Sequence, residues 1–142
     1  MDAMMISASA LTAERTRMNL IASTLANALT TRTPEGGPYK RKDAMFSAMS
    51  METPFSSMLD KKSQPDAKGV KVMEIMEDDN PPRLLYEPGH PDANAQGYVA
   101  YPNVNVVEEM TDMMTATRAY EANLTAAKAS MSMQMKSMEI GR

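Results

Sequence analysis

The first candidate for chemistry is the single histidine of the chain. His90 lies in residues 87–92, EPGHPD, where two prolines and a glycine predict a turn. A histidine can serve as a general base or a metal ligand. The chain offers no second histidine and no cysteine with which to share a metal. We therefore interpret His90 as a surface turn residue.

Two charged clusters are the other candidates for chemistry. Glu108, Glu109 and Asp112 could form an acid/base or cation-binding group. Two of them are adjacent and diverge on a helix, and all three suit the positive start of a helix dipole, which we take as their role. Lys40, Arg41 and Lys42 form a basic run. On a strand these side chains alternate between faces, which indicates a solvated or interface role rather than nucleic-acid binding.

Composition removes several classes of function. The chain has 142 residues, no cysteine and a net charge of −3 with a pI near 5.2. We expect no disulfide, no cofactor or metal, no nucleic-acid partner and no enzymatic activity. The chain contains no run of 18 apolar residues, so no transmembrane segment is predicted. Its acidic N-terminus does not resemble a cleavable signal peptide.

The apolar composition is unusual. There are 17 Met, but Leu, Ile, Val and Phe together number only 20. Methionine is flexible and specifies packing loosely. We expect a weakly packed monomer that gains stability by burial against partners.

Proline and glycine divide the chain into three parts. All nine prolines lie within residues 34–102, and residues 1–33 and 103–140 contain neither proline nor glycine. Because both residues interrupt helices, we predict a helical arm at 1–31, a middle lobe at 32–102 and a second helical arm at 103–142. The fold class is α+β, with the two arms paired antiparallel like a coiled coil. We expect a flexible segment near 47–68.

Each arm carries apolar residues at alternating steps of four and three, which is typical of a packed helix. The first row is Met4, Ala8, Leu11, Arg15, Met18, Ala22, Leu25 and Leu29. The second row is Val106, Met110, Met113, Thr117, Tyr120, Leu124, Ala127, Met131, Gln134 and Met138. These rows suit packing within one chain and equally packing between chains. In the middle lobe, strands are predicted at 39–46, 70–77, 83–87 and 98–101.

Five separated segments resemble bacterial flagellar rod and hook proteins. They are SALTAERTRMNLIASTLAN at 9–27, TPEGGPYKRK at 33–42, YEPGHPDA at 86–93, GYV at 97–99 with PNVNVVEEM at 102–110, and RAYEAN at 118–123. The resemblance implies a structural subunit of the periplasmic rod, exported unfolded through the flagellar type III apparatus. Its implied partners are other rod proteins, the rod–MS-ring junction protein and copies of itself. Its terminal helices would form the inner tube.

The rows and the resemblance together predict an assembly surface. Its residues are Leu11, Met18, Leu25, Asn27, Val106, Met110, Met113, Tyr120, Leu124, Met131 and Met138. Two other classes stay open at this point. A cytoplasmic coiled-coil adaptor or export chaperone would share the rows, but would not need the Gly-Gly-Pro-Tyr and Tyr-Glu-Pro-Gly turns. A hydrolase using His90 would need a pocket that the sequence does not indicate.

Overall fold

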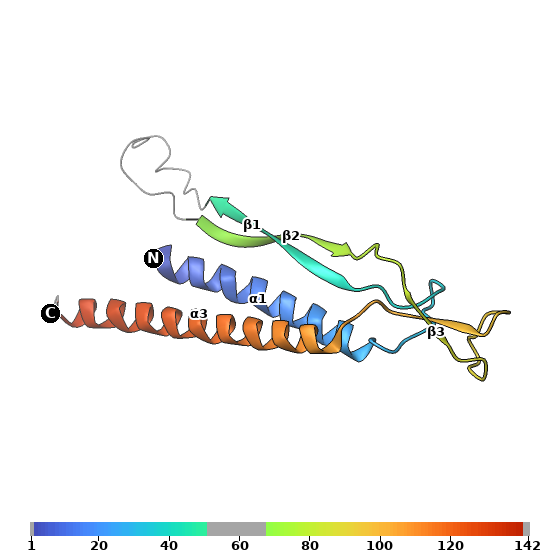
Figure 1. The fold of residues 1–142 in the computed structure, drawn as a ribbon. Helices are drawn as coiled ribbons and strands as arrows, with labels where there is room; N and C mark the ends of the chain where they lie inside the picture. Colours follow the sequence, from blue (N-terminus) through green and yellow to red (C-terminus); the bar gives the residue numbers. More distant parts are fainter. Residues whose placement is uncertain (1, 51–67, 141–142) are drawn as a thin grey trace.

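Two long antiparallel helices run side by side through the computed structural model, which describes residues 2–50 and 68–140 (Figure 1). Small antiparallel sheets join them, so the predicted α+β class with paired terminal helices is confirmed. The elements are α1 (Asp2–Ala26), β1 (Lys42–Ser50), β2 (Lys68–Glu77), β3 (Arg83–Tyr86), β4 (Tyr98–Tyr101) and α3 (Val106–Ile140).

Asparagine side chains bind backbone groups at the start of α3 and at the end of α1. The Asn105 side-chain oxygen accepts the Val107 N–H at 3.2 Å, and its carbonyl accepts the Glu109 N–H at 3.0 Å. Asn105 is thus the N-cap of α3, which begins at Val106, three residues into the predicted second arm. At the end of α1, the Asn27 side chain donates to the Ser23 carbonyl at 2.9 Å. The same carbonyl also accepts the Asn27 backbone N–H at 3.0 Å, so Asn27 binds the last turn of α1 through two donors.

The helix α1 is the middle layer of the molecule. The β1–β2 hairpin packs on one side of it and α3 on the other (Figure 1). The Val70 N–H of β2 donates to the Ser9 hydroxyl of α1 at 3.1 Å, which fixes the hairpin to the helix. Since α1 is covered on two sides, the described part of the chain leaves α3 more open than α1.

The two sheets each contain two strands. In the first, β1 pairs with β2 and the register shifts after Met45, so that Met73 is the extra residue of a bulge. In the second, β3 pairs with β4, with Tyr86 directly opposite Tyr98. Gly97 precedes β4 with φ +83°, and a Cβ there would lie 2.8 Å from the Tyr86 ring. Glycine is therefore required at this turn for both its backbone and the close approach.

Three predicted strands lie at or within two residues of their observed bounds, but the first is wrong by several residues. It was predicted at 39–46 and runs from Lys42 to Ser50. Gly36 and Gly37 both have positive φ, and the Tyr39 N–H donates to the Thr30 carbonyl at 3.1 Å. Residue 39 is consequently held against the end of α1 instead of pairing with β2. The predicted flexible segment overlaps β1 at 47–50, and its residues 51–67 lie outside the described residues.

The buried positions hold mostly small side chains. Ala13, Ala28 and Ala116 are among the few buried apolar residues, together with Ile21 and Val99. Small side chains let two helices approach closely, and large ones are then left on the outside. The predicted row of α1 is therefore not the face that this chain buries most deeply, because Met4 and Leu29 in that row are 39% and 78% exposed.

Removing one buried hydroxyl should stabilise the chain. Thr24 is fully buried, and its hydroxyl has no hydrogen-bond partner among residues 2–50 and 68–140. A valine of the same shape would fill the site without an unpaired polar group. We expect Thr24→Val to raise the free energy of unfolding by about 1 kcal/mol. Urea unfolding of the purified chain measures this. A lower stability for Thr24→Val would show that the hydroxyl is satisfied in solution.

Candidate assembly surface

The predicted assembly residues fall into two groups in the structure. The chain itself partly covers the first group, which is Leu11, Met18, Leu25, Asn27, Met113, Tyr120 and Leu124. The second group is exposed, with 42% of Val106, 54% of Met110, 51% of Met131 and 79% of Met138 accessible. All four exposed residues belong to α3. The structure thus partly covers seven of the eleven predicted assembly residues and leaves four exposed.

The chain buries a face of α3 that lies beside the predicted row. Glu109 and Ala116 are its buried residues, and Ala119, Asn123 and Ala127 are half-buried. Seven residues separate Glu109 from Ala116, so both lie on one side of the helix. A sequence search for large apolar side chains misses this face, because alanines and polar groups form it. The spacing of the alanines was the available signal.

The last ten described residues of α3 are all exposed. The helix has 35 residues and α1 has 25, a difference of about 15 Å along the axis. Figure 1 shows α3 continuing past the start of α1. Residues 131–140 therefore present large apolar side chains on every side, Met133 and Ile140 among them. Exposed apolar groups of this size are typical of surfaces that another chain covers.

A buried ion pair ties the base of the β1–β2 hairpin to α3. The Arg41 guanidinium donates to Glu109 at 2.5 Å and lies 3.7 Å from Asp112. Asp112 also lies 4.0 Å from Arg17 of α1. Glu109 is only 3% exposed, so little water could replace this partner if it were removed. Partial burial opposes the charged form of Arg41, but the hydrogen bond and the nearby carboxylates prevail and raise its pKa.

This ion pair gives the two charged clusters of the sequence a structural role. Glu109 points inward and Glu108 is exposed, as expected for adjacent helix residues. The neighbours of Arg41 bind other carboxylates. Lys40 pairs with Asp79 at 3.7 Å, and Lys42 pairs with Glu77 at 3.0 Å. The link between the two clusters could not be predicted from the sequence, because 68 residues separate Arg41 from Glu109.

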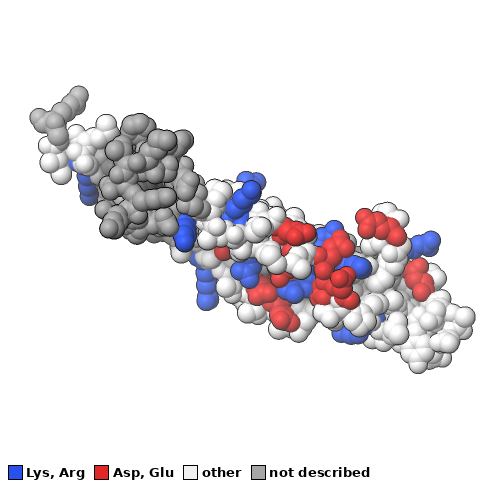
Figure 2. Space-filling model, turned by 90° about the horizontal axis from the view of Figure 1, so that it is seen from above, with Lys and Arg blue, Asp and Glu red and all other residues white. Residues whose placement is uncertain are grey.

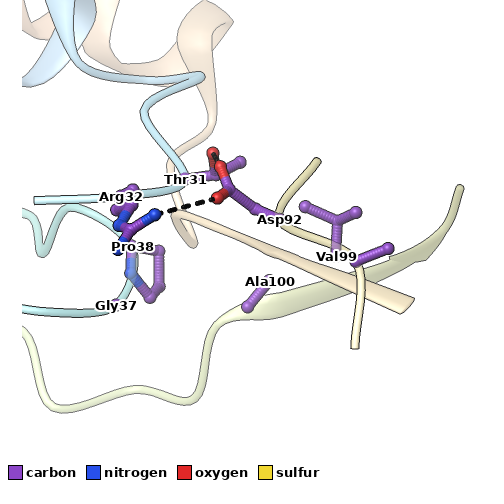
Figure 3. Close-up of a pocket in the computed structure, with 8 residues that line it drawn as sticks. Thr31, Arg32, Gly37, Pro38, Asp92, Val99 and Ala100 are labelled. Atoms are coloured by element: carbon purple, nitrogen blue, oxygen red, sulfur yellow. Dashed lines mark hydrogen bonds and ion pairs between the residues drawn. The ribbon is translucent and has the colours of Figure 1, made fainter. Parts of the chain in front are cut away.

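A second junction holds the far hairpin against the chain that leaves α1. Figure 3 shows a hollow where the Asp92 carboxylate accepts the Thr31 hydroxyl at 2.8 Å and lies 4.0 Å from Arg32. His90 stabilises the same turn, because its Nδ1 accepts the Asp92 N–H at 3.1 Å. Among the described residues, no group of three or more His, Asp or Glu could hold a metal ion. The imidazole thus takes part in the turn through the hydrogen bond that it accepts from Asp92.

The charges on the surface are mixed instead of segregated. In the view of Figure 2, acidic and basic side chains interleave over the middle of the molecule, and the end formed by β3 and β4 is mostly uncharged. In the described part of the chain, no helix is long and apolar enough to cross a membrane. The face seen in Figure 2 therefore carries no concentrated charge of one sign.

Comparison with known proteins places these surfaces in a family. Residues 95–140 match the family model described as the flagellar basal body rod FlgEFG protein C-terminal region. This match covers β4 and α3, and it indicates a flagellar basal-body rod protein, which is a structural and non-enzymatic class.

Relatives matched over nearly the whole chain narrow the assignment. The flagellar basal-body rod protein FlgC of Bacillus subtilis is 49% identical, over 96% of this chain and 95% of its own length. FlgC of Borreliella burgdorferi is 41% identical, over 95% of this chain and 93% of its own length. FlgC of Escherichia coli O157:H7 is 40% identical, over 96% of this chain and 94% of its own length. The chain belongs to the FlgC family, so it is a structural subunit of the flagellar basal-body rod.

Breaking the buried ion pair should destabilise the chain far more than breaking an exposed one. We expect Arg41→Met to lower the free energy of unfolding by roughly 2–4 kcal/mol, because Glu109 stays buried without its partner. The matched control is Lys42→Met, which removes the exposed pair with Glu77 and should cost under about 1 kcal/mol. The double variant Arg41→Met/Glu109→Leu should recover much of the loss. Equal effects of the two single variants would contradict the assignment.

His90 should be dispensable for motility. We expect His90→Asn to keep the turn, since an asparagine oxygen can accept the N–H two residues further on. His90→Ala loses that acceptor and should cost about 1 kcal/mol of stability. Swimming of both variants, measured on soft agar at equal subunit level, should match the wild type. A non-motile His90→Asn strain with normal subunit level would contradict a purely structural role.

Proposed function

We propose that this rod subunit assembles helically in the proximal rod, with copies of itself and with other rod proteins, and transmits motor torque. The observation that carries the proposal is the division of the helix surfaces. Small residues such as Ala13 and Ala116 are buried, while Met110 and Met131 on the predicted row stay exposed. Large exposed apolar side chains along a helix favour packing against further helices.

The proposed roles follow the three parts of the chain. Residues 1–31 and 103–142 would form the inner-tube part, and residues 32–102 the outer lobe. The antiparallel pairing of α1 with α3 supports this division. The Arg41–Glu109 pair supports a fixed angle between the lobe and the helices, because a buried ion pair resists displacement of either partner.

The proposed partners beyond the rod rest on the resemblance. They are the rod–MS-ring junction protein and the flagellar type III export apparatus. Export as an unfolded chain is supported by the small core, since few large side chains must leave their packing before the chain unfolds. The alternative of a cytoplasmic adaptor or export chaperone is less well supported, because the family of this chain is one of basal-body rod proteins.

A charge on the exposed row should block assembly without unfolding the subunit. Met131 is 51% exposed in the isolated chain, so Met131→Lys should leave its fold intact. Lysine is a good helix former and suits the C-terminal half of a helix. Leu124 is half-buried in the chain itself and is a poorer site for this test. We expect Met131→Lys cells to secrete the subunit normally but to lack rods and motility.

The control for this experiment lies two residues away. Met133 is 67% exposed on the opposite side of the same turn and is not in the predicted row. Met133→Lys should retain substantially more rod assembly than Met131→Lys, as counted in electron micrographs of extracted basal bodies. Normal rods carrying Met131→Lys would remove this row from the assembly surface. Equal loss in both variants would contradict the choice of this row over its opposite face.

A further inference from the structure

The free end of α3 carries a row of thioethers that the fold does not use. Met131, Met135 and Met138 are 51%, 63% and 79% exposed. They lie in the part of α3 that continues past the start of α1 (Figure 1). Each of their sulfur atoms is a weak Lewis base on a mobile side chain. Three of the twelve exposed methionines of the described residues therefore belong to this row.

The spacing places these three sulfurs on one stripe of the helix. Steps of four and three residues turn the helix by about 400° and 300°, so the three side chains point within roughly 60° of one another. The steps rise about 6 and 4.5 Å along the axis. A methionine side chain has three rotatable bonds beyond Cα, enough to bring neighbouring sulfurs in such a row onto one ion.

The donor set determines which ion would fit. Thioethers are soft, uncharged ligands and select Cu(I) over hard cations such as Mg²⁺ or Ca²⁺. The chain has no cysteine and only one histidine, which lies in the far lobe, so neither ligand competes in this region. Lys128 precedes the row by three residues and Glu139 follows it by one. Lys136 lies between Met135 and Met138, so these three charged residues together carry a net charge of +1.

We propose that Met131, Met135 and Met138 form a binding site for a soft monovalent metal ion of the Cu(I) class on the unassembled subunit. The site does not depend on the proposed assembly, but it shares Met131 and Met138 with the proposed assembly surface. An ion held by these sulfurs and a neighbouring helix packed on them exclude each other. Binding therefore belongs to the free chain, and assembly displaces the ion.

Silver(I) is the probe for this site, because it has the same ligand preference as Cu(I) and does not change oxidation state in air. Silver nitrate is titrated into the purified full-length chain in chloride-free buffer by isothermal calorimetry. We expect one dominant site and no binding of Zn²⁺ under the same conditions. Met135→Leu should weaken silver binding about tenfold or more, the scale on which losing a supporting group acts on metal affinity.

Met133→Leu is the matched control, because Met133 has similar exposure on the opposite side of the same helix. It should bind silver as the wild type does. Leucine is a good helix former, and circular dichroism verifies that both variants are folded. The proposal is overturned if the wild type binds no silver, if Met135→Leu binds as tightly as the wild type, or if Met133→Leu weakens binding equally.

The metal site and the assembly surface can be separated in the same set of strains. The triple variant Met131→Leu/Met135→Leu/Met138→Leu keeps an apolar row and loses the thioethers. We expect it to assemble and swim normally while losing the dominant silver site. Normal rods in Met131→Lys cells would refute the assembly surface and leave the silver result standing. Retained silver binding in the triple variant would refute the metal site and leave assembly untouched.

Discussion

The close approach of α1 and α3 is the constraint on which the rest of the structure depends. Ala13 of α1 and Ala116 of α3 are buried, and small side chains at buried positions let packed elements approach closely. The large apolar side chains are then displaced to the flanks, where the chain has nothing with which to cover them. A small core and a large exposed apolar surface are two results of one packing choice. A subunit built in this way gains much of its stability from its neighbours.

The ion pair between Arg41 and Glu109 adds a different kind of constraint. Apolar contacts along a helix are non-directional and tolerate sliding, whereas a guanidinium and a carboxylate fix distance and orientation together. The pair sits where the β1–β2 hairpin starts, next to the first turns of α3. Asp112 extends it to Arg17 on α1. One small network therefore contacts all three layers of the molecule at the same level.

The absence of proline and glycine predicted both helices, and alternation with turn residues predicted four strands. The structure differs where tertiary contacts override local pattern. The first strand starts at Lys42 because Tyr39 is hydrogen-bonded to the end of α1. The buried helix face could not be read from large apolar residues, because alanine forms it. The partner of Glu109 lies 68 residues away, a distance at which a single sequence carries no pairing signal. The proposed assembly and metal surfaces stay predictions.

The antiparallel arrangement has a mechanical consequence. Both chain ends emerge at one end of the helix pair, and the β3–β4 hairpin lies at the other (Figure 1). A force on the hairpin, opposed at the chain ends, acts parallel to the seam between α1 and α3. The two helices carry this force in parallel, so it neither slides one along the other nor separates them. The pair is therefore stiff along its axis even though its core is small.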